Sequence, residues 1–282
     1  MTKGGRNFFS DNPLGGGYGG FSKPIAGTRF TVWRSPMDND AEIRNEWEKK
    51  RLNHLWTHVD GFTVKPAEGS VVLETAVTLC APSLAPAFQG RILYEVNGRG
   101  DIRVEASLIP QRNEVSYLPR VGLVMELPLD FTTVDWYGHG PQENYPDLLD
   151  GAAFGLYSLP VTAWHEPYIR PQENGCRCGV RKAILRSADT ALMIKGEPTV
   201  ALTVHHYPQS VLDAAEHAWE IPAGMQTCQV FIDGFMSGVG TKSCGHPPLA
   251  PYLVKMEGPL TYAFVLSFDS RADQNDASMR KE

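Results

Sequence analysis

The sequence predicts an all-β protein, an antiparallel sandwich with one short helix near the N-terminus. Runs in which apolar and polar residues alternate recur along most of the 282 residues, and this is the period of a strand with one buried face. Turn-forming Gly, Pro, Asn and Asp separate the runs, and only one stretch has helical periodicity. No unit repeats at a fixed spacing, so the sequence favours a sandwich over a propeller.

The sequence divides into three parts. Residues 1–28 are rich in glycine and lack periodicity, which is typical of an arm or linker. Residues 29–272 contain the strand-like runs and are expected to form a single sandwich domain. Residues 273–282 form a polar tail that is expected to fray.

The elements follow in order along the central part. Residues 40–56 are the helix candidate, because Ile43, Trp47 and Leu55 fall near one stripe among charged residues. The strand-like runs come after it, at residues 62–65, 70–79, 91–96, 101–108, 121–127, 190–194, 200–204, 227–232 and 260–268.

Composition excludes several classes of function. The formal net charge of −6 argues against a nucleic-acid binder, which needs basic residues to neutralise phosphates. No apolar run approaches the ~18 residues that span a bilayer, so no membrane partner is expected. Five cysteines, odd in number and scattered, do not suggest a secreted disulfide framework, and we expect reduced thiols in a cytoplasm. Cys176 and Cys178 lack further ligands at zinc spacing, which favours two strand residues on one face.

Four segments, in this order, resemble the domain that closes the large β-galactosidases of glycoside hydrolase family 2. The first reads Trp-Arg-Ser-Pro-Met-Asp-Asn-Asp, and the second contains Gly-Pro-Gln-Glu-Asn-Tyr-Pro-Asp. The third contains Pro-Gln-Glu-Asn-Gly, and the last begins Asp-Gly-Phe-Met-Ser-Gly-Val-Gly. They occupy residues 33–40, 136–147, 171–179 and 233–247. Because they extend over nearly the whole chain, the resemblance is specific.

The resemblance implies a β-supersandwich similar in fold to galactose mutarotase, present either as the C-terminal domain (domain 5) or as a small subunit. It implies a partner, the catalytic large chain or barrel domain, whose active-site mouth this domain completes. The substrate would be a galactoside such as lactose, whose terminal β-D-galactosyl bond two carboxylates hydrolyse. The family carries those carboxylates, with its Mg and Na ions, on the barrel. No catalytic residue, metal site or cofactor is therefore expected in this chain.

The resemblance also points to substrate-binding residues. In the best-studied members a tryptophan at the position of Cys244 stacks on the sugar, whereas others have the Ser-Cys-Gly version seen here. A thiol lacks the flat apolar face needed for stacking, so acceptor binding would be weaker or built from other groups. The alternative, that Cys244 simply packs in a turn rich in Gly and Pro, is slightly favoured. Asp38, Asn39 and Asp40 precede a shortened version of a loop that moves over the active site. They suit sugar hydroxyls, but the general preference of Asp and Asn for helix caps favours a structural role.

Other interpretations remain open. Glu143 and Glu173 could be nominated as a catalytic couple, although turn positions after proline favour structural roles. His139 and the His205-His206 pair could be general acids, but loop or interface histidines are more common. An aldose epimerase would need a His acid and a Glu base on the sheet. A non-catalytic sugar-binding module would expose aromatic residues such as Trp136 or Trp164 in a groove.

Overall fold

The computed structural model describes residues 2–3, 6–7, 28–111, 115–221, 227–240 and 246–270. For residues 2–3, 6–7, 269 and 270 it describes the backbone only. Antiparallel strands make up most of this part, so the predicted all-β fold is confirmed. The predicted arm at residues 1–28 and tail at 273–282 lie almost entirely outside the described residues. No helix in the described part of the chain has the length and apolar character needed to span a membrane.

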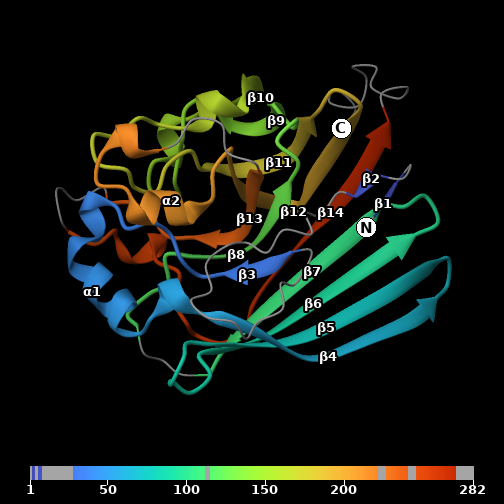
Figure 1. Cartoon of the computed structure of the whole chain (residues 1–282), viewed down its shortest axis with the longest axis horizontal. Helices are drawn as coiled ribbons and strands as arrows, with labels where there is room; N and C mark the ends of the chain where they lie inside the picture. Colours follow the sequence, from blue (N-terminus) through green and yellow to red (C-terminus); the bar gives the residue numbers. More distant parts are fainter. Residues whose placement is uncertain are drawn as a thin grey trace.

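The strands are numbered in chain order (Figure 1). They are β1 (Thr2–Lys3), β2 (Arg6–Asn7), β3 (Arg29–Thr31), β4 (Trp56–Ala67), β5 (Ser70–Cys80), β6 (Phe88–Asn97), β7 (Ile102–Pro110), β8 (Arg120–Leu127), β9 (Thr133–Gly140), β10 (Ala153–Pro160), β11 (Arg177–Arg186), β12 (Thr190–His205), β13 (Cys228–Met236) and β14 (Leu260–Ser270). The α-helices are α1 (Ala41–Lys49) and α2 (Gln209–Ala214), with 3-10 turns η1 (Asp38–Asp40), η2 (Leu52–His54), η3 (Leu149–Gly151), η4 (Val161–Trp164), η5 (Ala218–Glu220) and η6 (Ala250–Tyr252).

One forked sheet holds the domain together. Strands β10, β9, β11, β12, β14, β7, β6, β5 and β4 lie side by side in that order. The fork is at β12, whose residues 190–197 pair with β14 while residues 201–205 pair with β13. The second branch continues from β13 to β8 and then to β3. Because β12 takes part in both branches, one long strand sets the position of each branch relative to the other.

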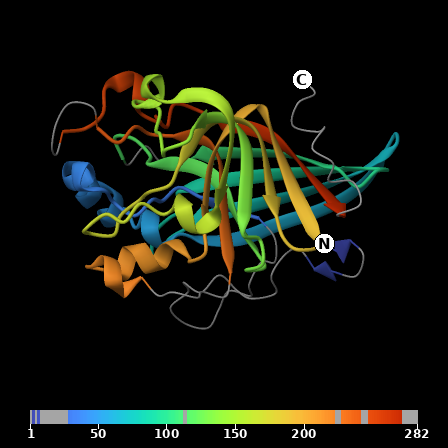
Figure 2. The same cartoon turned by 90° about the horizontal axis from the view of Figure 1, so that it is seen from above.

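The hydrophobic core lies between the two branches. Inward residues of β7, among them Val104 and Leu108, share one buried cluster with Leu123 of β8 and Ile232 of β13. Figures 1 and 2 show β4–β7 as long antiparallel strands side by side on one side of the molecule. The helices and many of the loops lie at the other end. This loop-rich end contains the segments that resemble the β-galactosidase domain.

The helix is shorter than the predicted 40–56. α1 ends at Lys49, because Arg51 adopts a left-handed conformation (φ 56°) that no α-helix continues through. Ile43 and Trp47 form its buried face, as the stripe predicted, and the Trp47 Nε1–H donates to the Tyr117 carbonyl at 2.8 Å. Leu55 lies beyond the helix, directly before β4, which itself is much longer than the predicted 62–65.

The strand-like runs predicted from the sequence do not include β3, β9, β10 or β11, although Cys178 of β11 is expected there to be a strand residue. In β9 every second residue is buried, but two of the four buried positions are glycines, Gly138 and Gly140, which hide the alternation. A Cβ at Gly138 would lie 2.9 Å from the Val180 Cα of neighbouring β11, so only glycine permits this close approach of strands. Apolar periodicity therefore fails to detect a strand in which glycines stand at the inward positions and the backbone of a neighbouring strand fills the space of their side chains.

Candidate functional site

The first and last family segments meet at one corner of the fold, around Arg34. This fully buried side chain donates to both carboxylate oxygens of Asp40, at 3.0 Å from Nε and 2.7 Å from Nη2. Its remaining N–H groups donate to the carbonyls of Ser237 and Gly238, both at 3.0 Å. A planar guanidinium suits this task, because its fork serves a carboxylate and two carbonyls at once. Arg34 thereby ties the Asp38–Asp40 turn to residues 237–240.

The second family segment reaches the same place through Asp147. Its carboxylate accepts the N–H groups of Val239, at 3.0 Å, and of Gly240, at 2.8 Å. A Cβ at Gly238 would lie 2.6 Å from the Asp147 Cγ, so the glycine is required for this approach. Residues 237–240 are therefore held from two sides, by Arg34 and by Asp147.

The third family segment closes the corner. The Asp38 N–H donates to Gln172 Oε1 at 3.0 Å, and Gln172 Nε2 donates to Asp38 Oδ2 at 3.2 Å. The Glu173 N–H donates to the Ser35 carbonyl at 3.0 Å. Contacts to the second segment are equally direct, since the Gly175 N–H donates to Glu143 Oε2 at 2.6 Å. All four segments thus converge on what we call the polar corner, residues 34–40, 143–147, 172–178 and 237–240.

The four predicted substrate-binding residues have different environments. Asp40 is buried, and besides Arg34 its carboxylate accepts the Met37 N–H at 3.0 Å. It therefore shapes the turn, as the structural interpretation predicted, but its side chain does not cap α1. Asn39 is half-buried and donates from Nδ2 to the Val239 carbonyl at 2.9 Å, while Asp38 is exposed. Cys244 lies outside the described residues.

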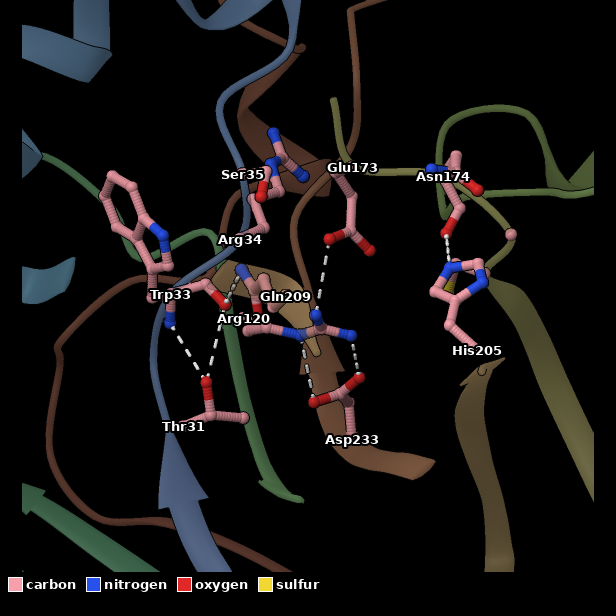
Figure 3. Close-up of polar contacts among 12 residues, drawn as sticks. Thr31, Trp33, Arg34, Ser35, Arg120, Glu173, Asn174, His205, Gln209 and Asp233 are labelled. Carbon is pink, nitrogen blue, oxygen red and sulfur yellow. Dashed lines mark hydrogen bonds and ion pairs between the residues drawn. The ribbon is translucent and has the colours of Figure 1, made fainter. Parts of the chain in front are cut away.

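A second ion-pair group lies beneath the corner (Figure 3). Arg120 binds Asp233 through Nη2 at 2.6 Å and Nε at 3.2 Å, and its Nη1 lies 3.4 Å from Glu173 Oε2. All three side chains are almost completely buried. Burial raises the pKa of Glu173 to about 7, although Arg120 and Arg34 act in the opposite direction. Arg34, Arg120 and Asp147 are not among the site residues predicted from the sequence. Arg34 and Asp147 lie within the family segments, which is the one sequence feature that points to them, and no such feature points to Arg120.

Glu143 and Glu173 lie in the same cluster but do not form an accessible catalytic couple. Glu143 accepts hydrogen bonds from the Tyr168 hydroxyl and the Gly175 N–H, and Glu173 is buried against Arg120. A glycosidase couple must reach the two sides of a sugar's anomeric carbon. Both carboxylates instead hold loops in place, as the turn positions predicted.

The three histidines named from the sequence each contact a backbone carbonyl through a ring nitrogen. His139 Nδ1 lies 2.8 Å from the Ala152 carbonyl, and His206 Nε2 lies 2.9 Å from the Phe131 carbonyl. His205 is buried, contacts the Asn174 carbonyl at 3.1 Å and stacks on Tyr207 with centroids 4.7 Å apart. Burial lowers the pKa of His205 to about 3. A buried neutral imidazole cannot meet a sugar from solvent, and nothing in this geometry favours the epimerase interpretation.

Trp136 and Trp164 are fully buried, so neither provides the exposed platform of a sugar-binding module. Their rings pack edge to face at 5.2 Å, and the Arg177 guanidinium lies 4.3 Å from the Trp164 ring centroid. Arg177 also donates to the carbonyls of Gly175 and Pro141, at 2.8 and 3.1 Å. These tryptophans anchor the loops of the polar corner from below.

The described cysteines are free thiols, and two of them form a buried pair. Cys176 and Cys178 point the same way, with Sγ atoms 3.7 Å apart and both side chains buried, as expected for a pair on one face. Within the described ranges, no three His, Cys, Asp or Glu side chains are grouped as metal ligands. Cys80, Cys176, Cys178 and Cys228 are free thiols.

Fold and site together define an all-β sandwich domain whose loops form one polar corner, in which half-buried Glu143 and buried Glu173 hold loops in place. Comparison with known proteins specifies the family: the chain belongs to the β-galactosidase small chain family, whose model matches residues 17–266. The β-galactosidase of Actinobacillus pleuropneumoniae is 31% identical over 250 residues, covering 87% of this chain and 24% of that protein. The β-galactosidase of Priestia megaterium is 32% identical over 218 residues, covering 76% of this chain and 20% of that protein.

The chain thus spans no more than a quarter of the length of these curated relatives. Among solved structures, a galactose 1-epimerase from Lactobacillus acidophilus is similar over 74% of this chain and 66% of its own. Its TM-score is 0.41 at 10% sequence identity.

Proposed function

We propose that this chain works as the small-chain part of a β-galactosidase. It completes the active-site mouth of a separate catalytic barrel, on a large chain or domain, that hydrolyses terminal β-D-galactosyl bonds such as that of lactose. The observation that carries the proposal is the convergence of the four family segments on the polar corner. Segments that match a glycosidase family and are far apart in sequence meet at one end of the sandwich.

The polar corner is suited to contact a sugar and not to cleave it. Asp38 is exposed and Asn39 is half-buried, so Asp38 in particular has a surface that a sugar hydroxyl can reach. The turn that carries them is rigid, because Arg34, Gln172 and Val239 hold it from three directions. A preorganised turn binds its ligand without losing further conformational entropy. Cys244 lies outside the described residues and remains a proposed contact of the sugar; in the sequence it follows residue 240 by four positions.

The cleavage itself is assigned to the partner. Retaining glycosidases need two carboxylates about 5 Å apart on either side of the scissile bond, and the barrel would supply them with its Mg and Na ions. This chain then needs no cofactor. The four free thiols suit a reducing cytoplasm, and the acidic net charge suits a protein without nucleic-acid partners.

The experiment is an activity assay of the purified chain, alone and mixed with the large chain from the same source. A chromogenic β-galactoside should be hydrolysed only by the mixture. Hydrolysis by the chain alone would place the acids in this chain, and conversion of α- to β-galactose without hydrolysis would support an epimerase instead.

Variants of the mixed enzyme sharpen this test. Asp38→Ala should raise KM about ten-fold, because one hydrogen bond to a charged group is lost. Lys65→Ala, on the distant strand β4, is the matched exposed control and should leave kcat and KM unchanged. Equal KM values for the two variants would remove Asp38 from the substrate site.

A further inference from the structure

Strands β4 and β5 carry apolar side chains that the described residues leave exposed. Val59, Phe62 and Val64 of β4 are 41%, 58% and 55% exposed, and Val71 of β5 is 41% exposed. Strand pairing sets Val59 opposite Val77, Phe62 opposite Thr75 and Val64 opposite Leu73. Side chains that alternate along β5 share one face, so these residues point the same way. We call this surface, residues 59, 62, 64, 71 and 73, the open face.

The open face is the continuation of the hydrophobic core. Leu73 is paired with Tyr94 of β6, and Tyr94 with Val104 of β7. Val104 is completely buried, Tyr94 and Leu73 are half-buried, and Val64 at the sheet edge is exposed. Burial therefore decreases strand by strand toward the edge, while the side chains remain apolar. Figure 1 shows β4 and β5 as the outer strands of this part of the sheet, beside β6 and β7.

The other face of the same strands carries charged and polar side chains, together with half-buried Val72 and Leu93. It carries Thr63, Lys65 and Glu74, with an ion pair between Arg91 and Glu74 at 2.5 Å. The face that carries Thr63, Lys65 and Glu74 is therefore largely solvated. The open face continues the hydrophobic core and is only partly buried. Exposed apolar surface of this kind marks an interaction site. Along its outer edge, β4 also has no strand partner among the described residues.

Thr28, the first described residue of the domain, lies on this face. Thr28 is buried, and its hydroxyl lies 2.5 Å from the Tyr94 hydroxyl. Phe30 follows, packed so closely that a Cβ at Gly90 would lie 2.6 Å from its Cε2. The matched part of the Actinobacillus relative is only 24% of that protein, so most of a β-galactosidase lies outside this chain. The start of the described domain, at Thr28, therefore lies beside the open face.

We propose that the open face is the docking surface for the large chain, which lays an extended segment with apolar side chains across β4 and β5. The inference rests on the proposed function, because it requires a large chain. It assigns the two ends of the domain to different contacts: the polar corner meets the active-site mouth, and the open face holds the two chains together. An apolar, uncharged patch of this kind is typical of permanent interfaces.

The test compares two neighbouring residues of β4. Val64→Asp puts a charge on the open face, and Thr63→Asp puts the same charge on the polar face of the same strand, where the side chain is also exposed. Binding of each variant to the large chain from the same source is measured by titration calorimetry. Val64→Asp should raise Kd about 10- to 100-fold and Thr63→Asp less than about 3-fold. Equal Kd values would overturn the docking surface while leaving the proposed function standing.

Wild-type chain that fails to bind the large chain would overturn both proposals. Hydrogen exchange separates the other possible occupants. In the complex, amides of residues 59–73 should gain protection. If those amides are already protected in the chain alone and lose protection when residues 1–27 are deleted, the chain's own arm covers the face and the proposal is wrong. It is equally wrong if sedimentation shows a dimer of this chain that Val64→Asp dissociates.

Discussion

The polar corner and the open face have opposite relations between chemistry and burial. In the corner and in the ion-pair group beneath it, Arg34, Arg120 and Asp233 are charged and fully buried, and each has an opposite charge within 3.2 Å. On the open face, Phe62 and Val64 are apolar and more than half exposed. A buried charge is stable only when its partners are present, so the corner must be complete within this chain. The open face is not covered by the described residues, and we infer that another chain covers it.

The largest effect is expected from breaking the ion pairs below the corner. Arg120→Met leaves Asp233 and Glu173 buried without their cation, so the free energy of unfolding should fall by about 3–5 kcal/mol. Urea unfolding of the isolated chain measures it. A loss below about 1 kcal/mol would mean that the corner is not self-sufficient and that the comparison fails.

Two phenylalanines on the same face of the sheet test the difference between the regions directly. Phe88 of β6 is buried and Phe62 of β4 is exposed. Phe88→Ala should lower the free energy of unfolding by about 3–4 kcal/mol, because it opens a cavity in the core. Phe62→Ala should cost less than about 0.5 kcal/mol in the isolated chain. Comparable losses for both would show that the open face is already covered.

Within the corner, Asp38 and Asp40 should respond differently to the same substitution. Asp40→Asn weakens two bonds to the Arg34 guanidinium, so the free energy of unfolding should fall by about 2–3 kcal/mol. Asp38→Asn changes an exposed carboxylate and should cost less than about 0.5 kcal/mol. Thermal and urea denaturation of the two variants check this, and the reverse order would remove Asp40 from the structural role.

The smallest effect is a pH dependence in which two buried groups oppose each other. The pKa of Glu173 is raised to about 7, so between pH 4.5 and 7 the folded chain binds more protons than the unfolded chain. Its contribution to the free energy of unfolding therefore falls as pH rises. The pKa of His205 is lowered to about 3, so between pH 3 and 6.5 the folded chain binds fewer protons, and its contribution rises with pH.

Between pH 4.5 and 6.5 the two contributions cancel in the wild type. Relative to it, His205→Gln should make the free energy of unfolding fall by about 1 kcal/mol per pH unit, and Glu173→Gln should make it rise by about as much. Denaturation at several pH values between 4.5 and 6.5 measures both slopes. Slopes of the same sign would contradict the environments described for the two groups.

Local pattern predicted much of this molecule. Alternation of apolar residues identified strands such as β5, β7 and β14, and the four family segments identified the class of protein before any coordinates. It failed for β9, where glycines replace inward side chains, and for the end of α1, where Arg51 turns left-handed. In both places the backbone of another segment or a local dihedral angle decides the structure, and neither is written in hydrophobic periodicity.

By itself, the sequence therefore determined the strand alternation, the acidic net charge and the family. The tertiary structure alone decided which charges pair and which apolar face stays open. Arg120 and Asp233 are separated by 113 positions, so no local pattern links them. Likewise, alternation in β4 shows that Phe62 and Val64 share a face, but not what covers it. Pairing and cover depend on which strands the fork at β12 brings together, and that is set by the whole chain at once.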